Sequence, residues 1–131
     1  MILVDTSVWI DLINGQPGAL VNEEDLLHYA TCSPVIQEVF QGLRETPQTG
    51  SFREAFLALP RLSDPLPLQT FLDAAEIYSR GRRRGWTVRS STDCLIAAIA
   101  ISNRVPVWHR DRGFALIARY TGLETVEPHD R

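Results

Sequence analysis

Short apolar segments alternate with helical segments along the whole chain, and this alternation constrains the fold more than any other feature. Ile2–Val4 is a continuous apolar run, as expected for a strand that is buried on both faces of a sheet. Further strands are predicted at 28–32, 105–108 and 123–126, and the proline-rich connector 60–67 has room for a short one. The pattern therefore predicts a three-layer α/β/α sandwich around a mostly parallel sheet of about five strands.

The predicted helices carry clear start signals. Ser33 and Pro34 have the residue types of an N-cap and a first helical position, and apolar residues recur at helical spacing up to Arg44. Residues 90–93 have the pattern of a capping box, and the helix 94–100 that follows is apolar on every side. We therefore expect this last helix to be buried in the core. Other helices are predicted at about 8–13, 20–27, 52–59, 71–80 and 114–120.

Size and composition predict one soluble globular domain covering residues 1–131. The longest apolar run, 94–101, is far shorter than the roughly 20 residues that cross a bilayer. No basic segment precedes the apolar start, so we expect no signal peptide, no membrane association and a cytoplasmic location. Cys32 and Cys94 fall in segments predicted to be buried; two core thiols are expected, with a disulfide as the alternative.

The charged residues exclude several kinds of chemistry. The net charge is −3, and all 13 basic residues are arginine. Without lysine, a Walker A phosphate loop, a lysine Schiff base and a lysine general base are excluded. The Gly-x-Ser-x-Gly turn of many hydrolases is also absent from the sequence. His28, His109 and His129 do not have the spacing of zinc ligands, so surface or hydrogen-bonding roles are expected for them.

Four acidic residues fall where strands end or where helices begin. Asp5 ends the first predicted strand, and Asp111 follows the strand that ends at Trp108. Glu38 lies on the helix after the second strand, and Asp93 lies in the first turn of the apolar helix. Ligands of open parallel sheets bind beyond the carboxyl ends of the strands, near the point where the strand order reverses. One site would receive all four acids if the strand order brings these ends together.

Each acid also has a purely structural interpretation. Asp5 and Asp111 could be N-caps, Asp93 could be the acid of its capping box, and Glu38 could be solvated. Carboxylates brought together repel one another, and burying them is unfavourable unless cations neutralise them. Only an arginine or a metal ion could do so in a chain without lysine. Mg²⁺ and Mn²⁺ prefer carboxylate oxygens, and such sites cut phosphodiesters with an activated water.

Four segments resemble the acidic motifs of PIN-domain ribonucleases. They are residues 4–10 (VDTSVWI), 34–39 (PVIQEV), 92–98 (TDCLIAA) and 109–114 (HRDRGF). The resemblance covers nearly the whole chain, with the motifs in family order and at family spacing. In length and in its opening segment, the chain is most similar to the VapC-type toxins of bacterial toxin–antitoxin pairs.

This resemblance implies a function and a site. It implies a PIN-like fold and Mg²⁺-dependent endonucleolytic cleavage of RNA, usually a structured tRNA or rRNA, with Mn²⁺ as a possible substitute. It implies that Asp5, Glu38, Asp93 and Asp111 are the catalytic, metal-binding acids. It also implies neutralisation by a cognate VapB-type antitoxin, and a homodimer formed through the amphipathic helices that run from Glu38 and from Phe71. Many relatives carry a further aspartate where this chain has Gly113, so an auxiliary acid is missing.

Partner-binding residues are predicted more loosely. An acidic pocket that admits RNA needs positive charge nearby, and stacking on Trp86 would add to it. The candidates for contacts with RNA are Arg82, Arg83, Arg84, Arg110 and Arg112, and the alternative is that they are solvated cations. The first helices carry many apolar residues, most of which should be core. By the resemblance, the candidates for contacts with the antitoxin are Trp9, Leu12, Ile13 and Leu20.

Two rival interpretations remain open at the level of sequence. A PIN nuclease could act in RNA processing without an antitoxin. A non-catalytic PIN-like scaffold could instead bind RNA or protein, although the intact acids argue against it.

Overall fold

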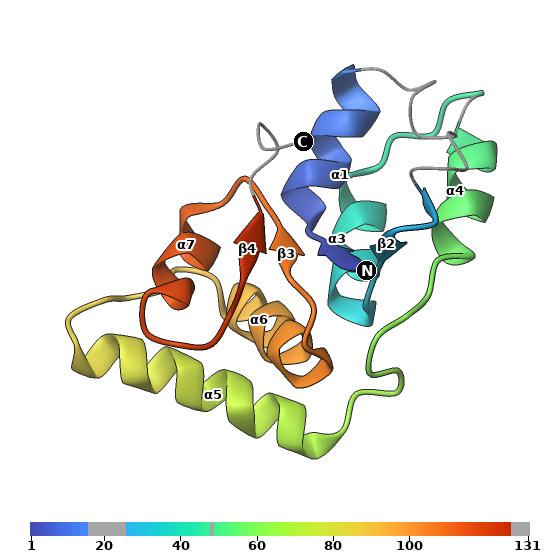
Figure 1. The fold of residues 1–131 in the computed structure, drawn as a ribbon. Coiled ribbons are helices and arrows are strands. Elements are labelled where there is room, and N and C mark those ends of the chain that lie inside the picture. Colours follow the sequence, from blue (N-terminus) through green and yellow to red (C-terminus); the bar gives the residue numbers. More distant parts are fainter. Residues whose placement is uncertain (16–25, 48, 127–131) are drawn as a thin grey trace.

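The computed structural model describes residues 1–15, 26–47 and 49–126 (Figure 1). The strands are β1 (Ile2–Val4), β2 (Tyr29–Ala30), β3 (Val107–Trp108) and β4 (Thr125–Val126). The helices bounded within these residues are α1 (Thr6–Gly15), α3 (Ser33–Gly42), α4 (Thr49–Leu57), α5 (Leu68–Arg83), α6 (Ser91–Asn103) and α7 (Arg112–Ala118). Most of the helix predicted at 20–27 lies outside the described residues.

The strands form one parallel sheet in the order β2-β1-β3-β4. Leu3 of β1 is paired with Ala30 on one side and with Val107 on the other. The predicted α/β sandwich with a parallel sheet is confirmed, with four strands instead of about five. The connector contributes only one isolated bridge, between Thr31 and Arg61. Proline lacks the N–H that a ladder needs, and three prolines in 60–67 prevent this bridge from extending into a strand.

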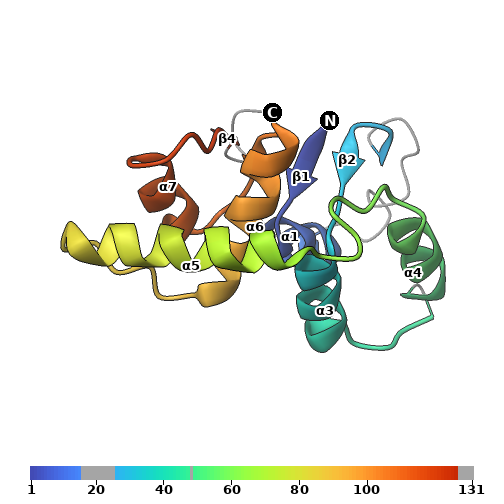
Figure 2. The same cartoon turned by 90° about the horizontal axis from the view of Figure 1, so that it is seen from below.

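Helix α6 is the central helix of the fold. The Ser90 hydroxyl accepts a hydrogen bond from the backbone N–H of Asp93 at 3.3 Å, which confirms the predicted N-cap. Seven of its residues are buried, as its apolar surface predicts. Helix α5 is the outermost helix, and α6 lies between it and the strands (Figures 1 and 2). Among the described residues, no helix combines the length and apolar character needed to span a membrane.

The start of α3 differs from the prediction. The helix begins at Ser33, so Cys32 is the N-cap residue, and no side chain caps the helix. It ends at Gly42 instead of Arg44. The Ser33 hydroxyl is instead turned toward Asp64, to which it donates at 3.4 Å. A long-range contact thus replaces the local cap that the sequence pattern favoured.

An aromatic cluster packs beneath α1. Trp9 makes edge contacts with Tyr29, Phe52 and Phe56, and its indole N–H donates to the carbonyl of Val4 at 3.1 Å. Phe52 and Phe56 stack on each other with ring centroids 5.3 Å apart. These contacts anchor α1 and α4 to the sheet. The cysteines are buried and unbridged, as predicted.

Candidate active site

The carboxyl ends of β1 and β3 lie side by side, and an acid follows each of them. The backbone N–H of Asp5 donates to the carbonyl of Trp108 at 3.0 Å, which extends the pairing of the strands by one step. The chain leaves β1 toward β2 and leaves β3 toward β4, so the two connections diverge in opposite directions. A crevice at such a reversal is where open parallel sheets bind ligands. Asp5 and Asp111 stand at this crevice.

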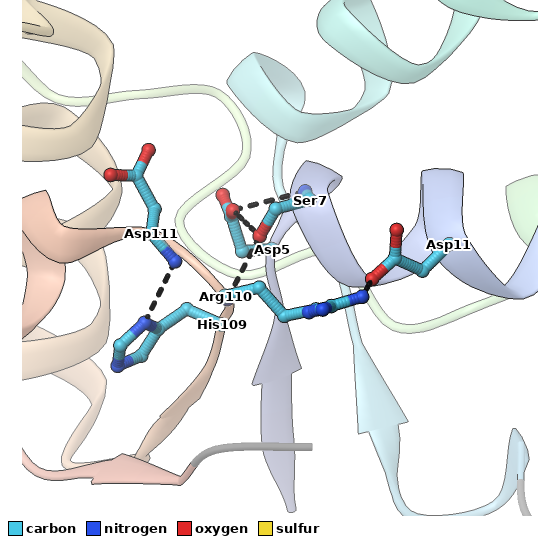
Figure 3. Close-up of polar contacts among 6 residues, drawn as sticks. All are labelled: Asp5, Ser7, Asp11, His109, Arg110 and Asp111. Carbon is cyan, nitrogen blue, oxygen red and sulfur yellow. Dashed lines mark hydrogen bonds and ion pairs between the residues drawn. The ribbon is translucent and has the colours of Figure 1, made fainter. Parts of the chain in front are cut away.

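Ser7 forms hydrogen bonds with residues on both sides of the crevice (Figure 3). Asp5 Oδ2 accepts hydrogen bonds from the Ser7 backbone N–H at 3.0 Å and from the Ser7 hydroxyl at 2.6 Å. The Ser7 hydroxyl oxygen in turn accepts from the backbone N–H of Arg110 at 3.1 Å. Ser7 therefore fixes the Asp5 carboxylate and joins α1 to the segment after β3. The bond from its backbone to Asp5 is also the helix cap that the sequence allowed for Asp5.

Glu38 reaches the same region from α3. Its Oε1 accepts a hydrogen bond from the Thr6 hydroxyl at 3.0 Å, because α1 and α3 pack against each other. Thr6 and Ser7, the residues directly after Asp5, thus each hold one acid.

Asp93 and Asp111 approach each other from the first turn of α6 and the start of α7. Asp93 is 6 % exposed, whereas Asp111 is exposed. Asp111 Oδ1 accepts from the backbone N–H of Gly113 at 2.9 Å, so this acid also has the helix-capping role that was its alternative. The backbone N–H of Asp111 donates to Nδ1 of His109 at 3.2 Å. His109 is buried against Phe114, a hydrogen-bonding role that the sequence favoured over metal binding.

The four acids influence one another electrostatically. Burial raises the pKa of Asp5, and repulsion from Asp111 adds to this, while hydrogen bonds from Ser7 act in the opposite direction. The pKa of Glu38 is also raised, first by burial and further by Asp5 and Asp111. Burial is the largest cause at Asp93, where repulsion from Asp111 and Asp5 helps to raise the pKa to about 8. The four carboxyl groups thus form one electrostatic unit that disfavours its own negative charge.

No arginine neutralises this unit within the described part of the chain. The ion pairs there join Arg61 to Asp64, Arg83 to Glu76 and Arg110 to Asp11. Arg110 stands at the crevice but turns its guanidinium toward Asp11 of α1 (Figure 3). A proton on Asp93, whose pKa is about 8, or a cation from solution can relieve the repulsion between these acids.

The donor set fits a hard divalent cation. Carboxylate and hydroxyl oxygens are the ligands that Mg²⁺ and Mn²⁺ prefer, and the acids at the crevice supply them. Among the described residues, no three acidic, histidine or cysteine side chains are gathered closely enough to hold an ion by themselves. Mg²⁺ does not require such a cage, because it keeps several waters and is commonly bound through one or two carboxylates. Asp93 and Asp111, whose carboxyl groups lie close enough to repel each other, offer such a pair.

A cavity of about 530 Å³ opens beside this acid pair. Its lining includes Asp93 and Asp111 together with Arg89, Arg110 and Arg112. Two of the arginines predicted to contact RNA therefore line the cavity. Arg89 also lines it, because the loop after α5 brings this residue to the start of α7.

Arg82, Arg83 and Arg84 do not line this cavity. Arg83 is paired with Glu76, and Arg82 lies over the Tyr78 ring at 5.6 Å. Their contact with RNA stays a prediction. Trp86, which had been considered for stacking, is half-buried, and the guanidinium of Arg119 lies 4.7 Å from its ring centroid.

The predicted antitoxin contacts separate into two groups. Trp9 is 1 % exposed, so it is a core residue and cannot serve as a surface anchor in this structure. Its ring is buried because it packs against the rings of the aromatic cluster beneath α1. Leu12 and Ile13 are partly exposed on α1 and stay candidates. Leu20 lies outside the described residues.

The fold and the placement of the acids define an α/β protein with an acidic crevice at the carboxyl edge of its sheet. A family model described as the PIN domain matches residues 2–120. The chain belongs to the PIN domain family.

Within that family, the chain is similar over nearly its whole length to proteins named as VapC ribonucleases. It is 35 % identical over 132 aligned residues to a VapC ribonuclease of Mycobacterium bovis, covering 96 % of this chain and 98 % of the relative. The same values hold for ribonuclease VapC11 of Mycobacterium tuberculosis.

Solved structures share the fold at lower sequence identity. VapBC2 from Rickettsia felis, bound to a DNA fragment from its promoter, is similar with a TM-score of 0.72 and 20 % identity, over 97 % of this chain and 98 % of that one. FitAcB from Neisseria gonorrhoeae has a TM-score of 0.72 and 20 % identity over the full length of both chains. VapBC-5 from Mycobacterium tuberculosis, described as a member of a family of toxin–antitoxin systems, has a TM-score of 0.65 and 22 % identity over 95 % and 96 % of the two chains.

Proposed function

We propose that this chain is a metal-dependent endoribonuclease, the toxin of a type II toxin–antitoxin pair, that hydrolyses phosphodiester bonds in a structured RNA. The observation that carries the proposal is the set of acids around Asp93, whose pKa is about 8 because it is buried among like charges. Strongly perturbed pKa values in a cleft are typical of functional sites. The relatives named as VapC ribonucleases support RNA as the substrate class.

The four acids have different proposed roles at the crevice. Asp93 and Asp111 would supply the pair of carboxylates that holds Mg²⁺ or Mn²⁺, and Asp5, oriented by Ser7, lies near enough to raise the pKa of Asp93 further. Glu38, oriented by Thr6, completes the negative charge. A bound ion would supply a Lewis acid and a water of lowered pKa as the nucleophile.

The cavity beside the acids suits an RNA backbone. Arg89 and Arg112 are exposed at its lining, so their charges are available to phosphates. Arginines placed around an acidic floor offset its repulsion of a polyanion. We therefore favour Arg89 and Arg112 as contacts with the strand being cut, while contact by Arg110, whose guanidinium is paired with Asp11, stays a prediction.

Partners are proposed from the relatives and from exposed apolar surface. Solved structures of the same fold are VapBC complexes, which supports a VapB-type antitoxin as partner. Leu68, Phe71 and Leu72 leave much of their surface exposed at the start of α5, which supports a homodimer through this helix. A PIN nuclease of RNA processing without an antitoxin is the second candidate; a neighbouring gene for a small DNA-binding protein would decide against it. A cytoplasmic location stays a prediction.

Cleavage of RNA by the purified chain tests the activity. We expect cleavage with Mg²⁺ or Mn²⁺, none with EDTA, and a loss of at least about 100-fold in Asp5→Asn. Asp73→Asn is the matched control, because Asp73 is exposed on α5 and only accepts a bond from Gln69. Equal cleavage by all samples would refute the proposal and point to a contaminating nuclease. Sequencing of the fragments made in cells would identify the RNA target.

A further inference from the structure

Gly113, the second residue of α7, lies directly against the acid pair. A Cβ at this position would stand 2.6 Å from Asp93 Oδ2 and 3.4 Å from Asp111 Oδ1. Real Cβ atoms essentially never approach a heavy atom within 3.0 Å, so any side chain here would force the Asp93 carboxyl to move. Gly113 also donates its backbone N–H to Asp111 at 2.9 Å.

Nothing in the backbone at this position requires glycine. The chain has positive φ at Gly85, Ser63 and Arg104, and Gly113 is not among the described residues with that conformation. Glycine is among the weakest helix formers and alanine is the strongest, so the first turn of α7 would be more stable with alanine if space allowed. The space that Asp93 occupies is therefore the physical reason for a glycine here.

We propose that Gly113 is a positioning residue: its missing side chain lets the Asp93 carboxyl of α6 approach the Asp111 carboxyl at the start of α7. The two acids can then lie on a common ion, a consequence that rests on the proposed function. The atom nearest the added Cβ is the carboxyl end of the Asp93 side chain, so an alanine here would turn this carboxyl from its present position without displacing backbone.

A double-mutant cycle without divalent ions tests the steric part of this proposal. Gly113→Ala is compared with Gly113→Ala in an Asp93→Ala background, where the atoms that the new Cβ would meet are gone. We expect Gly113→Ala to lower the melting temperature or leave it unchanged in the original chain, and to raise it in the Asp93→Ala background. Gly50→Ala in α4 is the matched control, because a Cβ there meets nothing within 4 Å. Identical effects of Gly113→Ala in both backgrounds would overturn the proposal.

Mn²⁺ titration by calorimetry tests the consequence for the ion. Displacing a residue that orients a metal ligand typically weakens metal binding about 10- to 100-fold, and we expect a loss in this range for Gly113→Ala and none for Gly50→Ala. RNA cleavage by Gly113→Ala should recover as Mn²⁺ is raised. A crystal structure of the Gly113→Ala variant should show Asp93 turned away from Asp111, and an unmoved carboxyl would contradict the inference. If the original chain neither binds Mn²⁺ nor cuts RNA, the proposed function fails, while the cycle and the crystal structure still decide the role of Gly113.

Discussion

Replacing Asp93 with asparagine should make the protein more stable in the absence of divalent ions while removing its activity. The folded-state pKa of Asp93 is about 8, above its ordinary value of 3.8. Between these values the folded protein binds more protons than the unfolded chain, so stability falls as pH rises through this window. Asparagine has nearly the same shape and does not ionise. The Asp93→Asn variant should therefore keep its stability as the pH rises through this window.

The size of the effect follows from the pKa of Asp93. A carboxyl whose pKa moves from 3.8 to about 8 on folding destabilises the protein at pH 7 by about 4 kcal/mol relative to its protonated form. Asparagine resembles the protonated form, so the gain at pH 7 is about 4 kcal/mol, or roughly 15 °C in melting temperature for a domain of this size.

Thermal unfolding with EDTA at pH 4 and at pH 7 measures this gain. It should be large at pH 7 and below about 1 kcal/mol at pH 4, which is close to the ordinary pKa of 3.8, so Asp93 is protonated in the folded protein and only about half ionised in the unfolded chain. Asp73→Asn should change neither value, since Asp73 is exposed. Saturating Mn²⁺ should raise the melting temperature of the original chain and leave the Asp93→Asn variant almost unchanged. An Asp93→Asn variant that melts below the original chain at pH 7 would refute the electrostatic account of the site.

Three further predictions concern other parts of the structure. Ser7→Ala removes a hydroxyl that donates to Asp5 at 2.6 Å, so the pKa of Asp5 should rise further. The pH profile of RNA cleavage should then move to higher pH, with about a tenfold loss of activity near neutrality. An unmoved profile would count against this role of Ser7. Arg89→Ala should reduce the salt dependence of RNA binding by the slope of about one phosphate contact, whereas Arg53→Ala, exposed on α4 and outside the cavity, should not; equal slopes in a filter-binding titration would exclude Arg89 from the interface. Phe56→Ala, which empties the centre of the aromatic cluster, should cost about 3–5 kcal/mol in urea denaturation and spare the specific activity of the folded fraction.

The predicted order and kind of the elements were correct where local signals agree with packing, although the helix ends differ by two or three residues. The Ser90 cap and the apolar surface of α6 placed this helix correctly, and Asp5 follows β1 as expected. The same reasoning erred at Ser33, whose residue type fits a cap but whose hydroxyl is turned toward Asp64. In place of the predicted fifth strand, the structure has a single bridge between Thr31 and Arg61, because the connector 60–67 is rich in proline.

The sequence by itself determined which acids stand at strand ends and helix starts, because hydrophobic periodicity and capping residues are read over a few neighbouring positions. Only the tertiary structure decided how those acids meet. Ser7 and Arg110 are 103 residues apart in the chain, and their hydrogen bond exists only because β1 and β3 pair. The contact of Gly113 with Asp93 and the burial of Trp9 likewise depend on how helices pack over long sequence separations, which no local pattern encodes.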